Sequence, residues 1–386
     1  MAISLLGDAM LYAVLPAKAA SMGIPIALVG VLLSVNRWVR IATNFGAAGA
    51  FARWGARRSM ITGSSLAIGS TLSYGVFPFF AAMLPARLAW GTAFSLLRLG
   101  AYNAVLATST ERNRGRVMGM FQSITWLGSM TGALVGGILT ESVGFRTTAI
   151  AFGLAGFLSL ALSSRVGKSL DSLGDSPNRR VDIREIAALL KWSPEFRVIF
   201  VTLVGSLAGT GVVVPTIGLL LFTTYGDSVD VFGMMTGVAA VAGFLVALRF
   251  GTETLFAPVS GFISDRYGRR FTVIFTGAAM VAGLVILFFS GSLVSIAIGA
   301  IIVFSAASGF HVALSAWTAD LARGGDWTIV MSGFATFRDA GTALGPLLAL
   351  PAAAIFGVHP TYAVAAGLLI IAFALLPAAK PPRRLP

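Results

Sequence analysis

The chain of 386 residues has no cysteine and only two histidines, His311 and His359. Without cysteine it can form neither a disulfide nor a thiolate metal site. Two scattered histidines provide little for the nucleophile, base or metal constellation of an enzyme. A complete phosphate-binding loop of the GxxxxGK(S/T) type is also missing, so ATP is not the expected energy source. We therefore expect no enzyme activity, no metal and no cofactor.

Charged residues are scarce as well, at 11% of the chain, whereas soluble domains contain about 25%. Apolar residues make up 56%, and the mean hydropathy is +0.87. Apolar stretches recur along the whole chain, each long enough to cross a hydrocarbon core about 30 Å thick. None has the short alternating pattern of a membrane β-barrel, and a helix satisfies its own backbone hydrogen bonds. The sequence thus predicts an all-α membrane protein.

The apolar stretches predict twelve transmembrane helices. We interpret the first as a retained helix that lacks a few upstream residues, because it has neither the basic start nor the small-residue cleavage site of a signal peptide. The expected spans are 3–22, 25–50, 59–78, 79–107, 116–140, 144–165, 195–225, 231–262, 271–290, 293–320, 328–352 and 360–379.

Positive residues predict the orientation of these helices. With both ends in the cytoplasm, twenty of the 28 Lys and Arg residues fall on the cytoplasmic side, and only Lys18 and Arg146 fall outside. We therefore expect a multi-pass protein of the bacterial inner (plasma) membrane. Its net charge of +13 is expected to contact anionic lipid headgroups rather than nucleic acid. Six arginines remain within the spans: Arg37, Arg40, Arg87, Arg98, Arg249 and Arg338.

A polar segment divides six helices from six. We expect an N-terminal six-helix bundle over 1–165, a cytoplasmic linker over 166–194 and a C-terminal bundle over 195–386. Within the linker, residues 181–192 have apolar residues at helical spacing, which predicts an amphipathic helix on the membrane surface. The halves match at an offset of 213 positions, which relates Gly55 to Gly268 and Gly128 to Gly341. Such registration predicts two structural repeats.

A charged loop after the eighth expected span carries the most specific motif. Its residues are Gly261, Asp265, Arg266, Gly268, Arg269 and Arg270. This segment resembles the GxxxDRxGRR loop of the major facilitator superfamily. The resemblance implies two pseudo-symmetric six-helix bundles that work by alternating access, with this loop as an inner gating motif. The alternative is a loop that only anchors the chain to lipid phosphate.

Weaker resemblances extend over the rest of the chain. In the N-terminal counterpart of the loop, Arg57 and Arg58 persist, but Ala52 replaces the aspartate, which weakens the expected latch. Arg87 and Gly91 are similar to the family's RxxxG segment in the fourth helix, and we group them with the gating motif. Glycines in the fifth helix are similar to an antiporter-associated motif without its proline; helix packing is the alternative explanation.

Ionisable groups inside transmembrane helices indicate a transport pathway or a buried partner. Asp8 on the first helix is the sharpest candidate for proton coupling, and Glu253 and Asp339 are the others. In a low-dielectric cavity, a carboxylate can bind and release a proton near neutral pH. The alternative for Asp8 is a carboxylate at the membrane surface.

Arginines outnumber carboxylates within the spans, which favours an anionic ligand. Interhelical salt bridges and snorkelling are the alternatives for several arginines, and core packing is the alternative for His311 and the tryptophans. The candidate substrate-binding residues are Tyr12, Asn36, Arg37, Arg40, Arg98, Tyr102, Arg249, His311, Trp317 and Arg338.

These features predict a monomeric secondary transporter. We expect it to move a small organic solute, anionic or amphipathic, with protons as the coupling ion and with export favoured over uptake. An uncoupled facilitator and a cation exporter are alternatives within transport. A membrane enzyme or a transporter-like sensor would be a different class, but a sensor usually adds a soluble output domain, for which this chain has no room.

Overall fold

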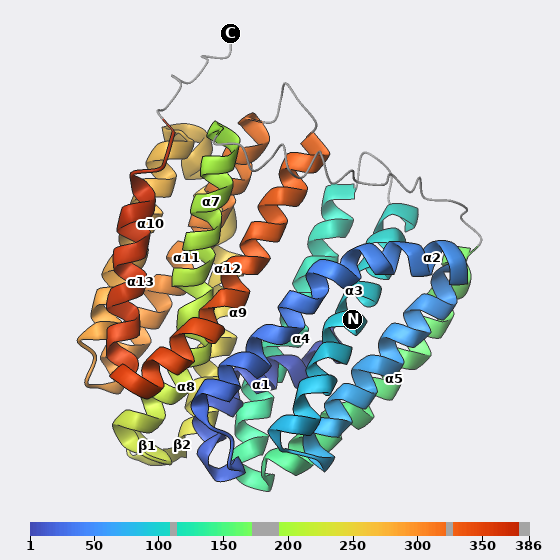
Figure 1. Ribbon diagram of the computed structural model, residues 1–386, viewed down its shortest axis with the longest axis horizontal. Helices are drawn as coiled ribbons and strands as arrows, with labels where there is room; N and C mark the ends of the chain where they lie inside the picture. The colour runs from blue at the N-terminus through green and yellow to red at the C-terminus, as the bar shows by residue number, and fades with distance from the viewer. Residues whose placement is uncertain (109–113, 172–192, 322–326, 378–386) are drawn as a thin grey trace. The chain divides into compact units, whose positions relative to one another are not determined.

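The computed structural model describes residues 1–108, 114–171, 193–321 and 327–377, and nearly all of them are helical (Figure 1). The described residues form two compact units. One is drawn from Met1–Arg179 and Ile217–Phe250, and the other from Arg180–Thr216 and Gly251–Pro386. Within the described residues the chain passes between the units inside two helices, α8 and α9, and each unit is described by itself.

The first unit is built mainly from five α-helices. The chain begins with a short 3₁₀ turn, and the unit ends with a β-hairpin and the start of α9. Its elements are η1 (Ile3–Leu5), α1 (Leu6–Lys18), η2 (Ala20–Met22), α2 (Ile26–Val76), α3 (Phe80–Thr108), α4 (Arg114–Val143), α5 (Phe145–Asp171), the end of α8 (Val212–Tyr225), β1 (Ser228–Val231), β2 (Met234–Gly237) and the start of α9 (Val238–Tyr267).

The second unit contains six helical elements besides its parts of α8 and α9. Its first span starts with Ser193, whose side chain accepts a hydrogen bond from the Phe196 N–H and so caps the helix. A π-helical turn interrupts this span. The elements are α7 (Pro194–Ser206), η3 (Leu207–Gly211), α10 (Arg269–Phe288), α11 (Leu293–Leu321), α12 (Trp327–Phe356) and α13 (Val358–Phe373).

Several helices are joined by a single glycine. The sequence predicts a connection between residues 50 and 59, but α2 is helical on both sides of Gly55, which alone departs from helical geometry at φ 77° and ψ 169°. Gly268, the matching residue of the other half, has φ 93° and ψ 154°. Gly144 and Gly357, also 213 positions apart, have φ 84° and 83°. Glycine tolerates positive φ because it has no Cβ, so the repeat predicted from sequence recurs in backbone geometry.

The predicted start of the eighth span, near residue 231, is wrong. Residues 228–237 instead form an antiparallel hairpin in which Val231 pairs with Met234 and Ser228 pairs with Gly237. The helix begins only at Val238. A short alternating pattern that lies within a long apolar stretch is difficult to distinguish from the start of the neighbouring helix.

Twelve helices can be traced in the described residues when α2 is divided at Gly55 and α7, η3 and α8 are taken as one span. Nine stretches within this part of the chain are long and apolar enough to cross a membrane, judged by length and composition. Helices α1 and α13 are shorter, with 13 and 16 residues. The amphipathic helix expected over 181–192 lies outside the described residues.

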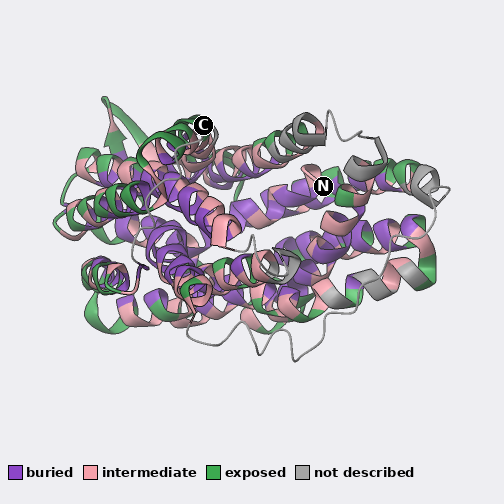
Figure 2. Ribbon diagram, turned by 90° about the horizontal axis from the view of Figure 1, so that it is seen from above, coloured by how far each residue is buried: buried purple, intermediate pink, exposed green. Residues whose placement is uncertain are grey.

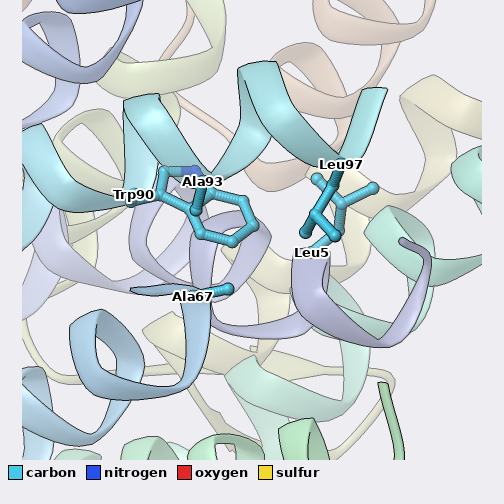
Figure 3. Packing of buried hydrophobic residues seen from close by; sticks show 5 residues of the cluster. All are labelled: Leu5, Ala67, Trp90, Ala93 and Leu97. Carbon is cyan, nitrogen blue, oxygen red and sulfur yellow. The ribbon is translucent and has the colours of Figure 1, made fainter. Parts of the chain in front are cut away.

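Burial follows the pattern of a membrane protein. Figure 2 shows buried residues on helix faces that meet other helices, while many outward faces are exposed. Large apolar side chains such as Leu127, Phe157 and Phe275 are more than half exposed, as expected of lipid-facing positions. In the first unit, η1, α2 and α3 meet in an apolar cluster (Figure 3). The cluster consists of Leu5, Ala67, Trp90, Ala93 and Leu97.

Glycines let α4 lie directly against α1. A methyl group at Gly132 would meet the backbone of Leu6 at 2.5 Å, and one at Gly136 would meet Met10. In the other half, Gly345 of α12 makes the same kind of backbone contact with Gly211 of η3. These contacts favour helix packing as the reason for the glycine pattern.

Candidate functional site

A buried ion pair joins α1 and α3 in the first unit. Arg87 of α3 has a side chain with no exposed surface, and its Nη1 donates a hydrogen bond to Oδ1 of Asp8 from α1. Its Nε donates to the carbonyl oxygen of Leu32 at 2.8 Å. Its Nη2 has no hydrogen-bond partner among the described residues. Because removing a charge's partner at such a site is costly, Asp8 and Arg87 form one electrostatic unit.

Gly91 explains how Arg87 reaches this position. It lies one helical turn after Arg87, on the same face of α3. A Cβ at Gly91 would overlap the carbonyl oxygen of Asn36 on α2. The glycine therefore allows α3 to approach α2 closely, which places Arg87 between the helices. The structure thus places Arg87 of the expected gating motif beside Asp8, while Gly91 packs against Asn36 of α2.

Three further candidates connect to the pair through hydrogen bonds. Asn36 donates from Nδ2 to Oδ1 of Asp8 at 3.4 Å. Arg37 donates from Nε to the Tyr12 hydroxyl at 3.2 Å, and its guanidinium lies 5.6 Å from the centre of the Tyr12 ring. The Tyr12 hydroxyl donates to the Leu33 carbonyl at 2.6 Å and lies 3.4 Å from Oδ1 of Asn36. The structure therefore brings together Asp8, Tyr12, Asn36, Arg37 and Arg87, which we call the Asp8 cluster.

A second group of cations lies further along α2 and α3. The guanidinium of buried Arg40 is 4.4 Å from the centre of the Phe94 ring, and that of Arg98 is 5.4 Å from the same ring. Both distances fit cation–π contacts. Nearby, the Ser95 hydroxyl donates to Oδ1 of Asn44 at 2.8 Å. This face of α2 and α3 is therefore polar, cationic and aromatic within a transmembrane segment.

Two candidates make contacts that favour packing. Tyr102 is 37% exposed and its ring meets Phe121 edge-on. His311 of α11 is buried; its Nδ1 lies 2.7 Å from the Ala307 carbonyl oxygen, and its Nε2 lies 2.7 Å from the Ser206 hydroxyl. Because a carbonyl only accepts, Nδ1 carries a proton and donates it to Ala307. Both ring nitrogens of His311 therefore have partners within the helical core.

The other candidates are dispersed over α9, α11 and α12. Arg249 is half-buried with its guanidinium 5.2 Å from the Phe250 ring centre. Glu253 and Asp339 are half-buried, Trp317 is buried, and Arg338 is exposed.

The charged loop between α9 and α10 is organised around Arg269. This residue donates from Nε to Asp320 of α11 at 2.9 Å, and from Nη1 to Asp265 at 2.5 Å and to the Ser264 hydroxyl at 2.9 Å. Asp265 therefore pairs with an arginine of its own loop. By contrast, Arg57, Arg58, Arg266 and Arg270 are exposed.

At the opposite ends of the helices, Glu141 of α4 makes two contacts. Its Oε2 lies 3.2 Å from Nζ of Lys18, and its Oε1 accepts a hydrogen bond from the Ala239 N–H at 2.8 Å. Ala239 is in the first turn of α9, where N–H groups lack helical partners and favour a carboxylate. Asp227 lies 3.8 Å from the same Lys18 nitrogen.

The sequence analysis identified charged residues within the helices but not the ion pairs that they form. It did not pair Arg87 with Asp8, Glu141 with Lys18 or Asp320 with Arg269. A search for opposite charges at similar depths in different helices of the same half could have suggested the first pair. Ser206 and Ser95 carry no comparable signal, because buried hydroxyl groups are common in transmembrane helices.

Comparison with known proteins decides the family. The profile described as "Major Facilitator Superfamily" matches residues 1–251 and again residues 199–386. The chain belongs to the Major Facilitator Superfamily. Membership confirms the predicted family and all-α membrane fold, and it makes this chain a multi-pass membrane protein.

Similar proteins include the multidrug resistance protein MdtG of Salmonella typhimurium, which is 23% identical over 269 residues, or 69% of this chain. The corresponding protein of Salmonella arizonae is 23% identical over 270 residues. In both cases the match spans 65% of the relative's length.

Among solved structures of this superfamily fold, the nucleoside transporter NupG has a TM-score of 0.78 at 13% identity, covering 97% of this chain and 96% of its own. A POT family transporter in complex with 5-aminolevulinic acid has a TM-score of 0.72 at 15% identity, covering 97% and 94%. At these identities the likeness shows the fold alone.

Proposed function

We propose that the chain is a proton-coupled secondary transporter of a small organic solute, anionic or amphipathic, with Asp8 as the proton site. The observation that carries the proposal is the Asp8 cluster, in which a carboxylate faces a fully buried arginine. Two six-helix halves, 1–165 and 195–386, alternate access to this site, joined by the linker over 166–194. Export, in keeping with the name of the multidrug resistance relatives, is the favoured direction if solute and proton exchange rather than move together.

Protonation of Asp8 changes the charge of the cluster in a definite direction. It removes one negative charge and leaves Arg87 without its counter-ion, so the potential around Arg37 and Arg40 becomes more positive. An anionic solute then binds more tightly, and by linkage its binding favours protonation of Asp8. Arginine suits such a site because its guanidinium stays charged and can bind a carboxylate through two hydrogen bonds.

A cation exporter is the second candidate, and the position of Asp8 favours it. Asp8 is the carboxylate of the cluster, so a cationic solute would compete with the proton for it. Exchange of a solute for a proton requires that the two compete for the site. Cooperative binding instead favours movement of solute and proton in the same direction. The pH dependence of solute binding therefore distinguishes the two candidates: anion affinity increases on acidification, and cation affinity decreases.

The test is transport by the purified protein in liposomes, with and without an imposed pH gradient. Counterflow first identifies solutes from a panel of anions, cations and neutral amphipaths. We expect accumulation of an identified solute only when the gradient is present. Accumulation that is independent of the gradient would contradict proton coupling and leave an uncoupled facilitator.

The loop around Arg269 is proposed to bias the protein between its inward- and outward-open forms. Asp265→Asn removes one exposed ion pair, which contributes about 0.3–0.5 kcal/mol, so we expect a shift of about twofold toward the inward-open form. Turnover should slow, with solute affinity little changed. Arg269→Ala should shift the balance further, because it also removes the bonds to Asp320 and Ser264.

Cysteine accessibility measures this shift, since the chain has no cysteine of its own. Reporter cysteines on either side of the membrane are introduced into each variant. Arg270→Ala is the matched control, because Arg270 is adjacent, equally charged and exposed. If Arg269→Ala and Arg270→Ala behave alike, the loop only anchors the chain to lipid.

A further inference from the structure

The hairpin between α8 and α9 has an exposed apolar tip. Phe232 is fully exposed at 101%, and Met234 is 67% exposed. Both turn residues have positive φ, 53° for Phe232 and 84° for Gly233. Such a two-residue turn favours Asn, Asp or Gly at its first position, and a bulky residue with positive φ is an outlier. A strained and exposed phenylalanine indicates that its side chain has a use outside the fold.

The two faces of the hairpin differ in polarity. Pairing of Val231 with Met234 and of Val229 with Thr236 places these four residues on one face, since side chains alternate along a strand. The opposite face carries Ser228 and Asp230, with Met235 beside Asp230. Asp230 also accepts a hydrogen bond from the Gly233 N–H at 2.7 Å, which fixes the turn. Near the tip, the face of Val231 and Met234 is therefore the more apolar one, while Val229 of the same face is buried in the protein and Met235 of the other face is 72% exposed.

The fold does not require this hairpin. In the first half, the matching helices α1 and α2 are joined by η2 and a short turn ending at Pro25. In the second half, the hairpin fills the equivalent connection, and α9 begins directly after Gly237. Its tip therefore stays within about 13 Å of the ends of two transmembrane segments, given a rise of about 3.3 Å per strand residue. At this distance an inclined hairpin lies in the polar layer that borders the hydrocarbon core.

We propose that Val231, Phe232 and Met234 insert into the lipid headgroup layer of the adjacent membrane surface, while the Asp230 face remains in water. Aromatic side chains favour this layer, where their rings leave water without entering the hydrocarbon. Insertion would hold the connection between α8 and α9 at the membrane surface. A protein partner would also cover an apolar tip, but the short tether to two spans favours the membrane.

The experiment compares two adjacent methionines of similar exposure. Phe232→Cys, Met234→Cys and Met235→Cys variants each carry one nitroxide label in phosphatidylcholine vesicles. Collision rates are measured with oxygen, which concentrates in lipid, and with a water-soluble nickel complex. We expect the oxygen-to-nickel ratio at positions 232 and 234 to exceed that at 235 several-fold.

Equal ratios at 234 and 235, with free access of nickel to both, would show a hairpin standing in water and would overturn the proposal. Labels shielded from both reagents would also overturn it, in favour of a protein partner. Each labelled variant must elute from size-exclusion chromatography as the parent does and must keep the parent's midpoint of thermal unfolding. The collision rates do not depend on the transported solute or on the coupling ion. The proposal of membrane insertion can therefore fail while the proposed function holds.

Discussion

Asp8→Asn is expected to abolish solute accumulation driven by a pH gradient and to leave solute exchange intact. Asparagine keeps the shape of the side chain and can still accept a hydrogen bond, but it cannot bind and release a proton. Exchange at equal pH needs no net proton movement, so it tests the rest of the pathway. Both rates are measured with purified protein in the same liposome preparation.

The substitution also has a structural consequence that must be separated from coupling. It leaves the fully buried Arg87 without its counter-ion, and loss of one partner of a buried pair costs about 3–5 kcal/mol of stability. Asp8→Asn is therefore also expected to lower the midpoint of thermal unfolding. The double variant Asp8→Asn/Arg87→Gln removes both charges and should recover much of that stability.

The double variant separates the two roles of Asp8. If Asp8 carries the proton, restored stability will not restore accumulation. If accumulation returns in the double variant, Asp8 serves as a counter-ion and another group carries the proton. Glu253 and Asp339 would then be the next carboxylates to replace.

Arg37→Ala is expected to weaken binding of an anionic solute well over tenfold. Arg37 lies beside Tyr12 in the Asp8 cluster, in a low-dielectric region where charges are weakly screened. Loss of one partner of a desolvated charge contact costs about 2–5 kcal/mol, and 1.4 kcal/mol corresponds to a factor of ten. Arg40→Ala should have a comparable effect, whereas Arg37→Lys should restore binding only in part because lysine cannot form the two-point contact.

The matched control is Arg165→Ala, which removes the same charge from an exposed position on α5. Direct binding to each purified variant is measured over anionic, neutral and cationic solutes, together with thermal stability. If the parent protein prefers a cation, or if folded Arg37→Ala and Arg40→Ala variants bind anions normally, the arginines are structural. The cation exporter would then be the better description.

The fold could be predicted from the sequence because the membrane simplifies the problem. Apolar stretches of span length, an asymmetry of positive charge and one specific loop motif lead to twelve helices of this superfamily. The errors lie at the connections. The helical break at Gly55 and the hairpin at 228–237 involve few residues, and local apolar character extends across both. The π-turn at 207–211 has no sequence signature in a stretch where every residue is buried.

The candidate site could be predicted only as separate residues. Asp8, Tyr12 and Arg37 stand out in sequence because polar groups are rare in transmembrane helices. Their association with Arg87 depends on how α1, α2 and α3 are rotated about their axes. That rotation is set by close contacts such as the one between Gly91 and Asn36, which a single sequence does not reveal.

The one-residue glycine connections limit how this protein can move. A connection of one residue between consecutive helices contributes only two backbone torsions. Gly144 and Gly357 join their helices in this way, as do Gly55 and Gly268. Each such helix pair therefore has few internal degrees of freedom and should travel as one rigid body. Large displacements must be absorbed elsewhere, in longer connections such as 226–237, so distance measurements across Gly144 or Gly357 should remain constant throughout a transport cycle.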